Sequence, residues 1–222
     1  VDIKFKISVW SGPDKEYLSS DEYIINVKNS ILLYGVYTSD LTLSPDKEYL
    51  VSANLVMDDS TTLTILPGTE LYVSKGVTLW IRGNLNAIGT NDKRIKFLPE
   101  NNSWDGFQLY GVSSGGTIVF DYCEFHGSIN DYRGLFKFGY PAKSSMTLSN
   151  SIIAISGDYI DATGYQTTII SKSNFVGKGL SMWQLGGNAS SLTQSNIIGT
   201  ADTSNLSGYD TSVDGNGFIN NN

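Results

Sequence analysis

The hexapeptide Ile170-Ser171-Lys172-Ser173-Asn174-Phe175 decides the fold, because similar hexapeptides recur along the second half of the 222-residue chain. Each copy begins and ends with an apolar residue and has a small or polar residue at its fourth position. The other copies are Phe120-Asp121-Tyr122-Cys123-Glu124-Phe125, Leu148-Ser149-Asn150-Ser151-Ile152-Ile153, Leu192-Thr193-Gln194-Ser195-Asn196-Ile197 and Val213-Asp214-Gly215-Asn216-Gly217-Phe218. Neighbouring copies begin 28, 22, 22 and 21 residues apart, a period that indicates a protein built from stacked repeats.

The first half of the chain repeats short apolar triplets at a similar period. One set starts 22 residues apart each time and comprises Leu63-Thr64-Ile65, Leu85-Asn86-Ala87 and Phe107-Gln108-Leu109. A second set, with steps of 24 and 23 residues, comprises Leu71-Tyr72-Val73, Ile95-Lys96-Phe97 and Ile118-Val119-Phe120. Two sets at one period predict several strands in each repeat, and we expect each set to form one column of stacked strands.

Short strands separated by tight turns explain both patterns. Within the triplets the side chains alternate between two faces, and turns such as Pro67-Gly68 and Arg82-Gly83 lie between them. Three short strands and three turns fit a coil of about 22 residues. The sequence therefore predicts an all-β protein, a parallel β-helix with three short strands per coil. The fourth residues of the hexapeptides then share one column, in which Cys123 is a small buried residue and not a nucleophile.

Composition excludes several kinds of partner and site. The chain has 22 acidic and 15 basic residues, a formal net charge of -7, which argues against binding to a nucleic-acid backbone. A single Cys cannot form an internal disulfide, and a single His cannot build a multi-histidine metal site. We therefore expect no metal, no cofactor and no nucleic-acid partner.

The chain shows no targeting or membrane signal. No run of about 18 apolar residues occurs, so we expect no membrane insertion. The start, Val1-Asp2-Ile3-Lys4, lacks Met and does not form a signal peptide, which suggests a mature or excised fragment.

Two stretches carry a family resemblance. Residues 61–73 and 79–90 resemble successive coils of right-handed parallel β-helix proteins of the pectate-lyase-like superfamily, especially secreted bacterial surface proteins. Arg94-Ile95-Lys96-Phe97 and Trp104-Asp105-Gly106-Phe107 follow at the expected places. The resemblance covers about residues 41–222, which we interpret as the β-helix domain. Residues 1–40 are then an N-terminal cap or a strand from a preceding region, and the resemblance implies an extracellular protein, either secreted or attached to the cell surface.

The resemblance raises the question of catalysis, because polygalacturonases share this fold. They carry Asn-x-Asp, an Asp pair, Gly-His-Gly and Arg-Ile-Lys in that order, whereas this chain has only fragments in another order. The fragments are Asp58-Asp59, Arg94-Ile95-Lys96 and Phe125-His126-Gly127. We interpret them as coincidence, with Ile95 pointing inward and Lys96 outward beside the Tyr72 position.

Other carboxylate groupings are equally weak. Arg133 near Asp131 and Asp121 is the best arrangement for lyase chemistry, and Asp158 with Asp161 is the best pair for an inverting hydrolase. Aspartates on turns usually bind the backbone or water. Residues 210–217 resemble a calcium loop only faintly and lack its distal Glu. We therefore expect no catalytic residue and no metal ligand.

Aromatic residues suggest a binding surface instead. Alternation turns Tyr72 and Trp80 outward. The 28-residue step predicts a protruding loop at residues 130–141, in which Phe136 and Phe138 face the core as a short strand and Tyr132, Arg133 and Tyr140 are the contact residues. Exposed rings can stack on sugars, although single exposed aromatics also occur without function, so both interpretations stay open. The candidate carbohydrate-binding residues are Tyr72, Trp80, Tyr132, Tyr140, Tyr159, Tyr165, Trp183 and Tyr209.

These features lead to three hypotheses. The first is a non-catalytic extracellular adhesion module that attaches to a long or insoluble, cellulose-like polysaccharide. The tapirins, cellulose-binding proteins with a β-helical binding domain and exposed aromatics, are similar in this respect. The second is a polysaccharide lyase or glycoside hydrolase of the pectate-lyase-like fold, and the third is a structural stalk of a surface or fibre protein.

Overall fold

The computed structural model describes residues 2–11, 16–26, 30–109, 116–129, 134–138, 145–156, 160–162, 167–185, 191–193, 195–202 and 217–219. The chain forms two compact units, residues 1–30 and residues 31–222. Among the described residues, none belongs to a helix long and apolar enough to cross a membrane.

The first unit contains an antiparallel hairpin. Strand β1 (Asp2–Ser11) pairs with β2 (Glu16–Asn26), from Asp2 opposite Asn26 to Ser11 opposite Glu16, and the register shifts between Val9 and Trp10. The second unit begins with strand β3 (Ile31–Tyr37), which pairs with β5 (Tyr49–Met57) of the same unit. The role of residues 1–40 as a cap stays a prediction.

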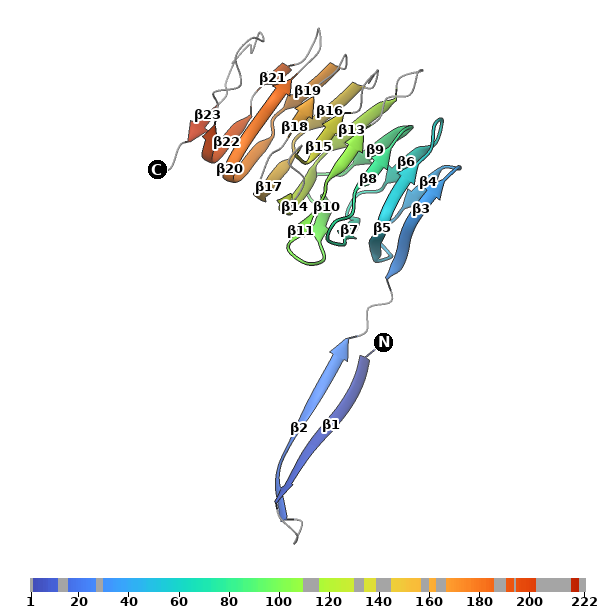
Figure 1. Cartoon of the computed structure of the whole chain (residues 1–222), viewed down its shortest axis with the longest axis vertical. Helices are drawn as coiled ribbons and strands as arrows, with labels where there is room; N and C mark the ends of the chain where they lie inside the picture. The colour runs from blue at the N-terminus through green and yellow to red at the C-terminus, as the bar shows by residue number, and fades with distance from the viewer. Residues whose placement is uncertain are drawn as a thin grey trace. The chain divides into compact units, whose positions relative to one another are not determined.

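The second unit is a parallel β-helix, as the repeats predict. Its strands stack side by side in chain order, from β3 and β4 at one end to β22 and β23 at the other (Figure 1). Every pairing recorded in it is parallel, and the strands form one 14-stranded and one seven-stranded sheet.

Each coil crosses three faces, which confirms the prediction of three short strands. Face 1 and face 2 belong to the larger sheet, because β5 pairs through its first half with a strand of face 1 and through its second half with a strand of face 2. Face 1 comprises β7 (Glu70–Val73), β10 (Ile95–Pro99), β14 (Cys123–Ile129), β17 (Ile152–Ser156) and β23 (Gly217–Ile219), with the first halves of β3, β5, β20 (Asn174–Leu185) and β22 (Asn196–Asp202).

Face 2 comprises β8 (Leu79–Ile81), β12 (Phe107–Leu109), β15 (Phe136–Phe138) and β18 (Ile160–Ala162), with the second halves of β3, β5, β20 and β22. Face 3 is the seven-stranded sheet of β4 (Leu41–Leu43), β6 (Thr62–Ile65), β9 (Asn84–Ile88), β13 (Thr117–Asp121), β16 (Ser145–Ser149), β19 (Thr167–Ser171) and β21 (Ser191–Thr193). The short strand β11 (Ser103–Trp104) pairs with the end of β14.

The hexapeptide column is confirmed on face 3. Phe120 pairs with Leu148, Leu148 with Ile170 and Ile170 with Leu192. Val213, the start of the last copy, lies outside the described residues.

The triplet columns are only partly correct. Leu63 does pair with Leu85, but the next residue in that column is Ile118. Phe107, predicted there, pairs with Leu79 on face 2. The coil between Leu85 and Ile118 is lengthened by a turn at residues 89–94 and by β11, so counting 22 residues reaches the wrong face.

The second triplet column is correct in stacking its first two strands, since β7 and β10 pair on face 1, but its register and its third member are wrong for a related reason. Leu71 pairs with Phe97, two residues beyond the predicted Ile95, and Ile95 pairs with Cys123. Ile118 belongs to face 3. A strand register depends on backbone pairing, and unequal turns move equivalent residues away from a constant period.

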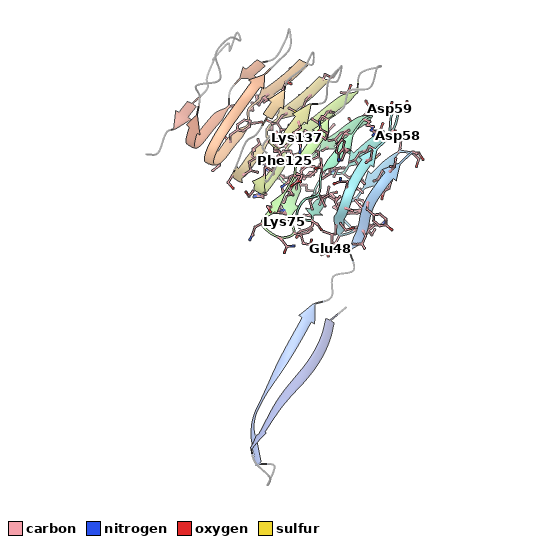
Figure 2. The ribbon with its side chains drawn as sticks, in the orientation of Figure 1. Glu48, Asp58, Asp59, Lys75, Phe125 and Lys137 are labelled. Atoms are coloured by element: carbon pink, nitrogen blue, oxygen red, sulfur yellow. The ribbon has the colours of Figure 1, made fainter. Side chains whose placement is uncertain are left out.

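Inward side chains of successive coils fill the interior with aromatic rings. The Phe97 and Phe125 rings stack with centroids 4.9 Å apart and planes within 2°, and Phe107 contacts both rings edge-on. Phe125 is labelled within the stacked coils in Figure 2. Trp104 and Tyr49 are also buried, so part of the aromatic content serves the core.

A serine ladder runs along the corner between face 3 and face 1. The Cys123 N–H donates to Ser151 Oγ at 3.1 Å, the Ser151 N–H to Ser173 Oγ at 3.3 Å and the Ser173 N–H to Ser195 Oγ at 3.2 Å. Ser151 and Ser173 also donate their hydroxyl protons to the carbonyls of residues 149 and 171. The predicted column of small buried residues is therefore confirmed from Cys123 to Ser195.

The residue before each of the first three ladder positions turns the chain through the corner. Tyr122, Asn150 and Lys172 have φ values of 49°, 50° and 50°. This left-handed conformation suits Asn and costs other side chains roughly 1 kcal/mol. The corner therefore repeats its backbone geometry even where the side chains differ.

We predict that Ser173→Ala destabilises the protein by about 1–3 kcal/mol, because it leaves the buried Ser151 N–H without its acceptor. Chemical denaturation measures the change. Ser74→Ala is the matched control, since the Ser74 hydroxyl bonds Glu100 at an exposed position and its loss should change the free energy of unfolding by less than about 0.5 kcal/mol. Equal effects of the two substitutions would contradict the ladder.

Candidate functional site

The structure describes three of the eight predicted aromatic contact residues. Tyr72 on β7 and Trp80 on β8 are half-buried and point outward, as alternation predicts. Trp183 lies on β20 with its backbone opposite Asp161, and its side chain is outside the described part. Tyr132, Tyr140, Tyr159, Tyr165 and Tyr209 lie outside the described residues, as do Asp131, Arg133, Asp158 and residues 210–216.

On face 2, the outward side chains of the two coils that follow Trp80 are buried. Val56, Trp80, Gln108 and Lys137 follow one another in register, yet Gln108 is only 2% and Lys137 only 1% exposed. Gln108 Nε2 donates to the Lys137 carbonyl at 3.4 Å, and Lys137 Nζ donates to the Asp105 carbonyl. Figure 2 labels Lys137 among the middle coils. This covered surface leaves little room for a ligand that spans several coils.

Face 1 is open over the same coils. Every described outward side chain on β7, β10, β14 and β17 is half-buried or exposed. The outward residues form two columns. The apolar column contains Leu32, Leu50, Tyr72 and Leu98, which pair in that order, and the charged column contains Glu70, Lys96 and Glu124.

A hydrogen bond from Tyr72 joins the two columns at an ion pair of the charged column. Lys96 Nζ lies 2.8 Å from Glu70 Oε1, and the Tyr72 hydroxyl donates to Glu70 Oε2 at 3.4 Å. The hydrogen bond and the charge of Glu70 raise the pKa of Lys96. The ammonium group therefore stays charged at neutral pH and remains matched to a carboxylate.

Glu124 is the centre of a second cluster. Its carboxylate lies 3.7 Å from Arg94 Nε and 3.2 Å from His126 Nε2. Arg94 also donates from Nη1 to the Asn150 carbonyl at 2.8 Å, and its guanidinium carbon lies 5.5 Å from the Tyr122 ring centroid. These contacts extend the polar surface of face 1 to the corner that carries the serine ladder.

Asp121 is engaged at the same corner by neutral donors. Its Oδ1 accepts hydrogen bonds from Ser149 Oγ at 2.7 Å and from Asn150 Nδ2 at 2.8 Å. The carboxylate therefore links successive coils. This structural role differs from the lyase chemistry considered for Asp121.

The fragments of the polygalacturonase pattern are only partly brought together. Ile95 is buried and Lys96 points outward, as predicted, but Lys96 lies opposite Glu70 and not opposite Tyr72. Arg94 and His126 meet at Glu124. Asp58 and Asp59 lie elsewhere: both are labelled at the edge of the stack away from Phe125, the neighbour of His126 (Figure 2), and Asp58 is 3.7 Å from Arg82. The structure therefore does not assemble the complete set.

Sequence reasoning missed the columns of face 1. Leu32, Leu50 and Leu98 are outward in strand alternation, but their alignment with Tyr72 requires the register of coils of unequal length. Tyr34, which is 61% exposed, was also missed and lies at the register shift of β3. The Arg94 to Glu124 contact required the register between β10 and β14, in which Ile95 pairs with Cys123.

No group of three or more His, Cys, Asp or Glu side chains suited to a metal ion occurs among the described residues. No protein-family model, curated protein or solved structure matches the chain. The open face with its two columns is therefore the feature from which a function has to be inferred.

The Cys123 thiol provides a pH-dependent prediction. Burial raises its pKa, so above its ordinary pKa of about 8.5 the thiol ionises only in the unfolded chain and unfolding becomes more favourable as pH rises. Relative to Cys123→Ser, the wild-type free energy of unfolding should fall by about 1 kcal/mol between about pH 7.5 and 9.5.

Cys123→Ser is a suitable reference because serine already occupies the next three positions of the ladder. The wild-type thiol should also resist a thiol reagent until the protein is denatured. Parallel pH profiles for the two proteins, or labelling of the folded wild type, would show that Cys123 is not buried.

Proposed function

We propose that the chain is a non-catalytic, extracellular carbohydrate-binding module that attaches to a long or insoluble polysaccharide through face 1. The observation that carries the proposal is the open apolar column with Tyr72 in it, next to a column of fixed charged side chains. Sugar polymers present both apolar ring faces and hydroxyl groups, which such a surface can contact together.

The repeat architecture supports attachment to a polymer. Each coil adds an equivalent strand at a step of about 4.8 Å, so side chains in one column form a line of similar contacts. Weak contacts repeated along a line produce strong overall attachment when the ligand also repeats. A compact pocket would favour a small ligand instead.

The resemblance of residues 61–73 and 79–90 to secreted bacterial β-helix surface proteins adds to the proposal. It favours an extracellular location, and the tapirins offer a model of cellulose attachment through exposed aromatics. The β-helix fold occurs in both enzymes and binding proteins, so the extracellular location and the cellulose-like ligand rest on the resemblance of these two stretches.

A polysaccharide lyase or hydrolase is the second candidate, favoured by the contact of Arg94 and His126 with Glu124. A carboxylate flanked by two basic groups can position a substrate or transfer a proton. If the protein is an enzyme, acidic and neutral polysaccharides should yield new reducing or unsaturated ends, and Glu124→Gln should abolish them. A structural stalk predicts neither products nor retention on a polymer.

We predict that the 222-residue chain is retained on insoluble cellulose or xylan and that Tyr72→Ala lowers retention about fivefold or more, because the ring contributes apolar contact area. A pull-down at several polymer concentrations measures the change. Tyr34→Ala is the control, since Tyr34 is a more exposed tyrosine outside the apolar column.

Both variants should keep the wild-type unfolding temperature within a few degrees, since neither ring belongs to the core. Absence of wild-type retention on cellulose, xylan and pectin would reject the carbohydrate-binding function. Equal losses for Tyr72→Ala and Tyr34→Ala would reject face 1 as the contact surface.

A further inference from the structure

We infer that face 1 binds an uncharged, extended polysaccharide that runs along the axis of the β-helix, over the apolar column and beside the charged column. This inference rests on the proposed function and adds two features to it, the direction of the polymer and its lack of charge. Each feature follows from a separate observation on face 1.

The direction follows from the register of the apolar column. Leu32, Leu50, Tyr72 and Leu98 lie on four successive strands and are paired residue to residue. A line through them is perpendicular to the strands, with a rise of about 4.8 Å per strand. A polymer along this line meets an apolar side chain at each coil, whereas a polymer along a strand such as β7 meets one charged and one apolar position and then the corner.

On face 1 this line stays apolar through four open coils, whereas the outward column of face 2 is apolar at Val36, Val56 and Trp80 and then reaches the buried Gln108 and Lys137. Leu32 is 54% exposed, and the other three residues are half-buried on the outside of the sheet. On face 3 the equivalent outward positions on the first three strands are Thr42, Thr64 and Asn86. A continuous line of outward apolar side chains on an open face supports a surface that a ligand covers.

The column continues with smaller or more polar side chains. His126 pairs with Ala154, and Ala154 pairs with Val176, which is exposed. His126 contacts Glu124, so a polar group enters the line at this coil. The surface therefore offers apolar contacts in the first coils and mixed contacts after them, which suits a chain of sugars more than a purely apolar partner.

The lack of charge follows from the ion pairs. Lys96 is paired with Glu70, and Arg94 lies beside Glu124, so each of these cations already has a carboxylate partner on the face. Asp121 adds a further carboxylate at the corner, and the chain has a net charge of -7. A polyuronate would have to compete with these carboxylates, whereas sugar hydroxyls can bond both members of each pair.

Leu98→Thr tests this inference, with Val119→Thr as the matched control. Both residues are half-buried, outward-facing and apolar, but Val119 lies on face 3. Threonine suits an exposed strand position, so both variants should fold. Retention of the 222-residue chain on cellulose, xylan and polygalacturonate is measured at low and high salt.

We expect retention on cellulose or xylan that is unchanged by salt, at least about fivefold weaker retention of Leu98→Thr, and a change of less than about twofold for Val119→Thr. Polygalacturonate should retain the wild type more weakly than the neutral polymers at either salt concentration.

The outcomes separate this inference from the proposed function. Retention mainly on polygalacturonate, with loss at high salt, overturns the uncharged ligand but leaves carbohydrate binding in place. Retention on a neutral polymer that Leu98→Thr does not weaken overturns the axial path along the apolar column. Absence of retention on all three polymers overturns both the inference and the proposed function.

Discussion

Parallel backbone pairing between successive coils is the constraint on which the structure depends. It places equivalent residues of each coil one above another, so an inward position becomes a column of the core and an outward position becomes a column of the surface. The stacked Phe97 and Phe125 rings and the serine ladder are two products of this alignment. The apolar column of face 1 is a third, and it differs from the others only in facing outward.

The sequence was sufficient for the fold class because alternation and period are local properties. It was also sufficient for the register from Phe120 to Leu192, where the corner residues Tyr122, Asn150 and Lys172 share one conformation. It failed at Phe107, because the turns after β9 and β10 change length and shift the count without changing the pairing. Pairing is a contact between distant segments, so a fixed period cannot replace it.

For the candidate site, too, the sequence predicted the features that follow from local alternation and missed those that depend on contacts between distant segments. Alternation correctly turned Tyr72 and Trp80 outward, yet it could not distinguish an open face from a covered one. The burial of Gln108 and Lys137 makes that distinction for face 2. The contact of Arg94 with Glu124 likewise depends on the register between β10 and β14. In the sequence, Arg94 and His126 appear only as parts of motifs that occur in the wrong order for a polygalacturonase, and nothing there indicates that both contact Glu124.

In the proposed function, the ion pairs of face 1 serve binding more than stability. Half-exposed pairs such as Lys96 with Glu70 contribute at most about 1 kcal/mol to folding, because solvent screens them. They do restrict long side chains that would otherwise lose conformational entropy when a ligand binds. The Tyr72 hydroxyl is tied to the same carboxylate, so the ring and the charges beside it are positioned together. A surface arranged in this way can bind a flat, repeating ligand with little rearrangement, which is the property that attachment to an insoluble polymer requires.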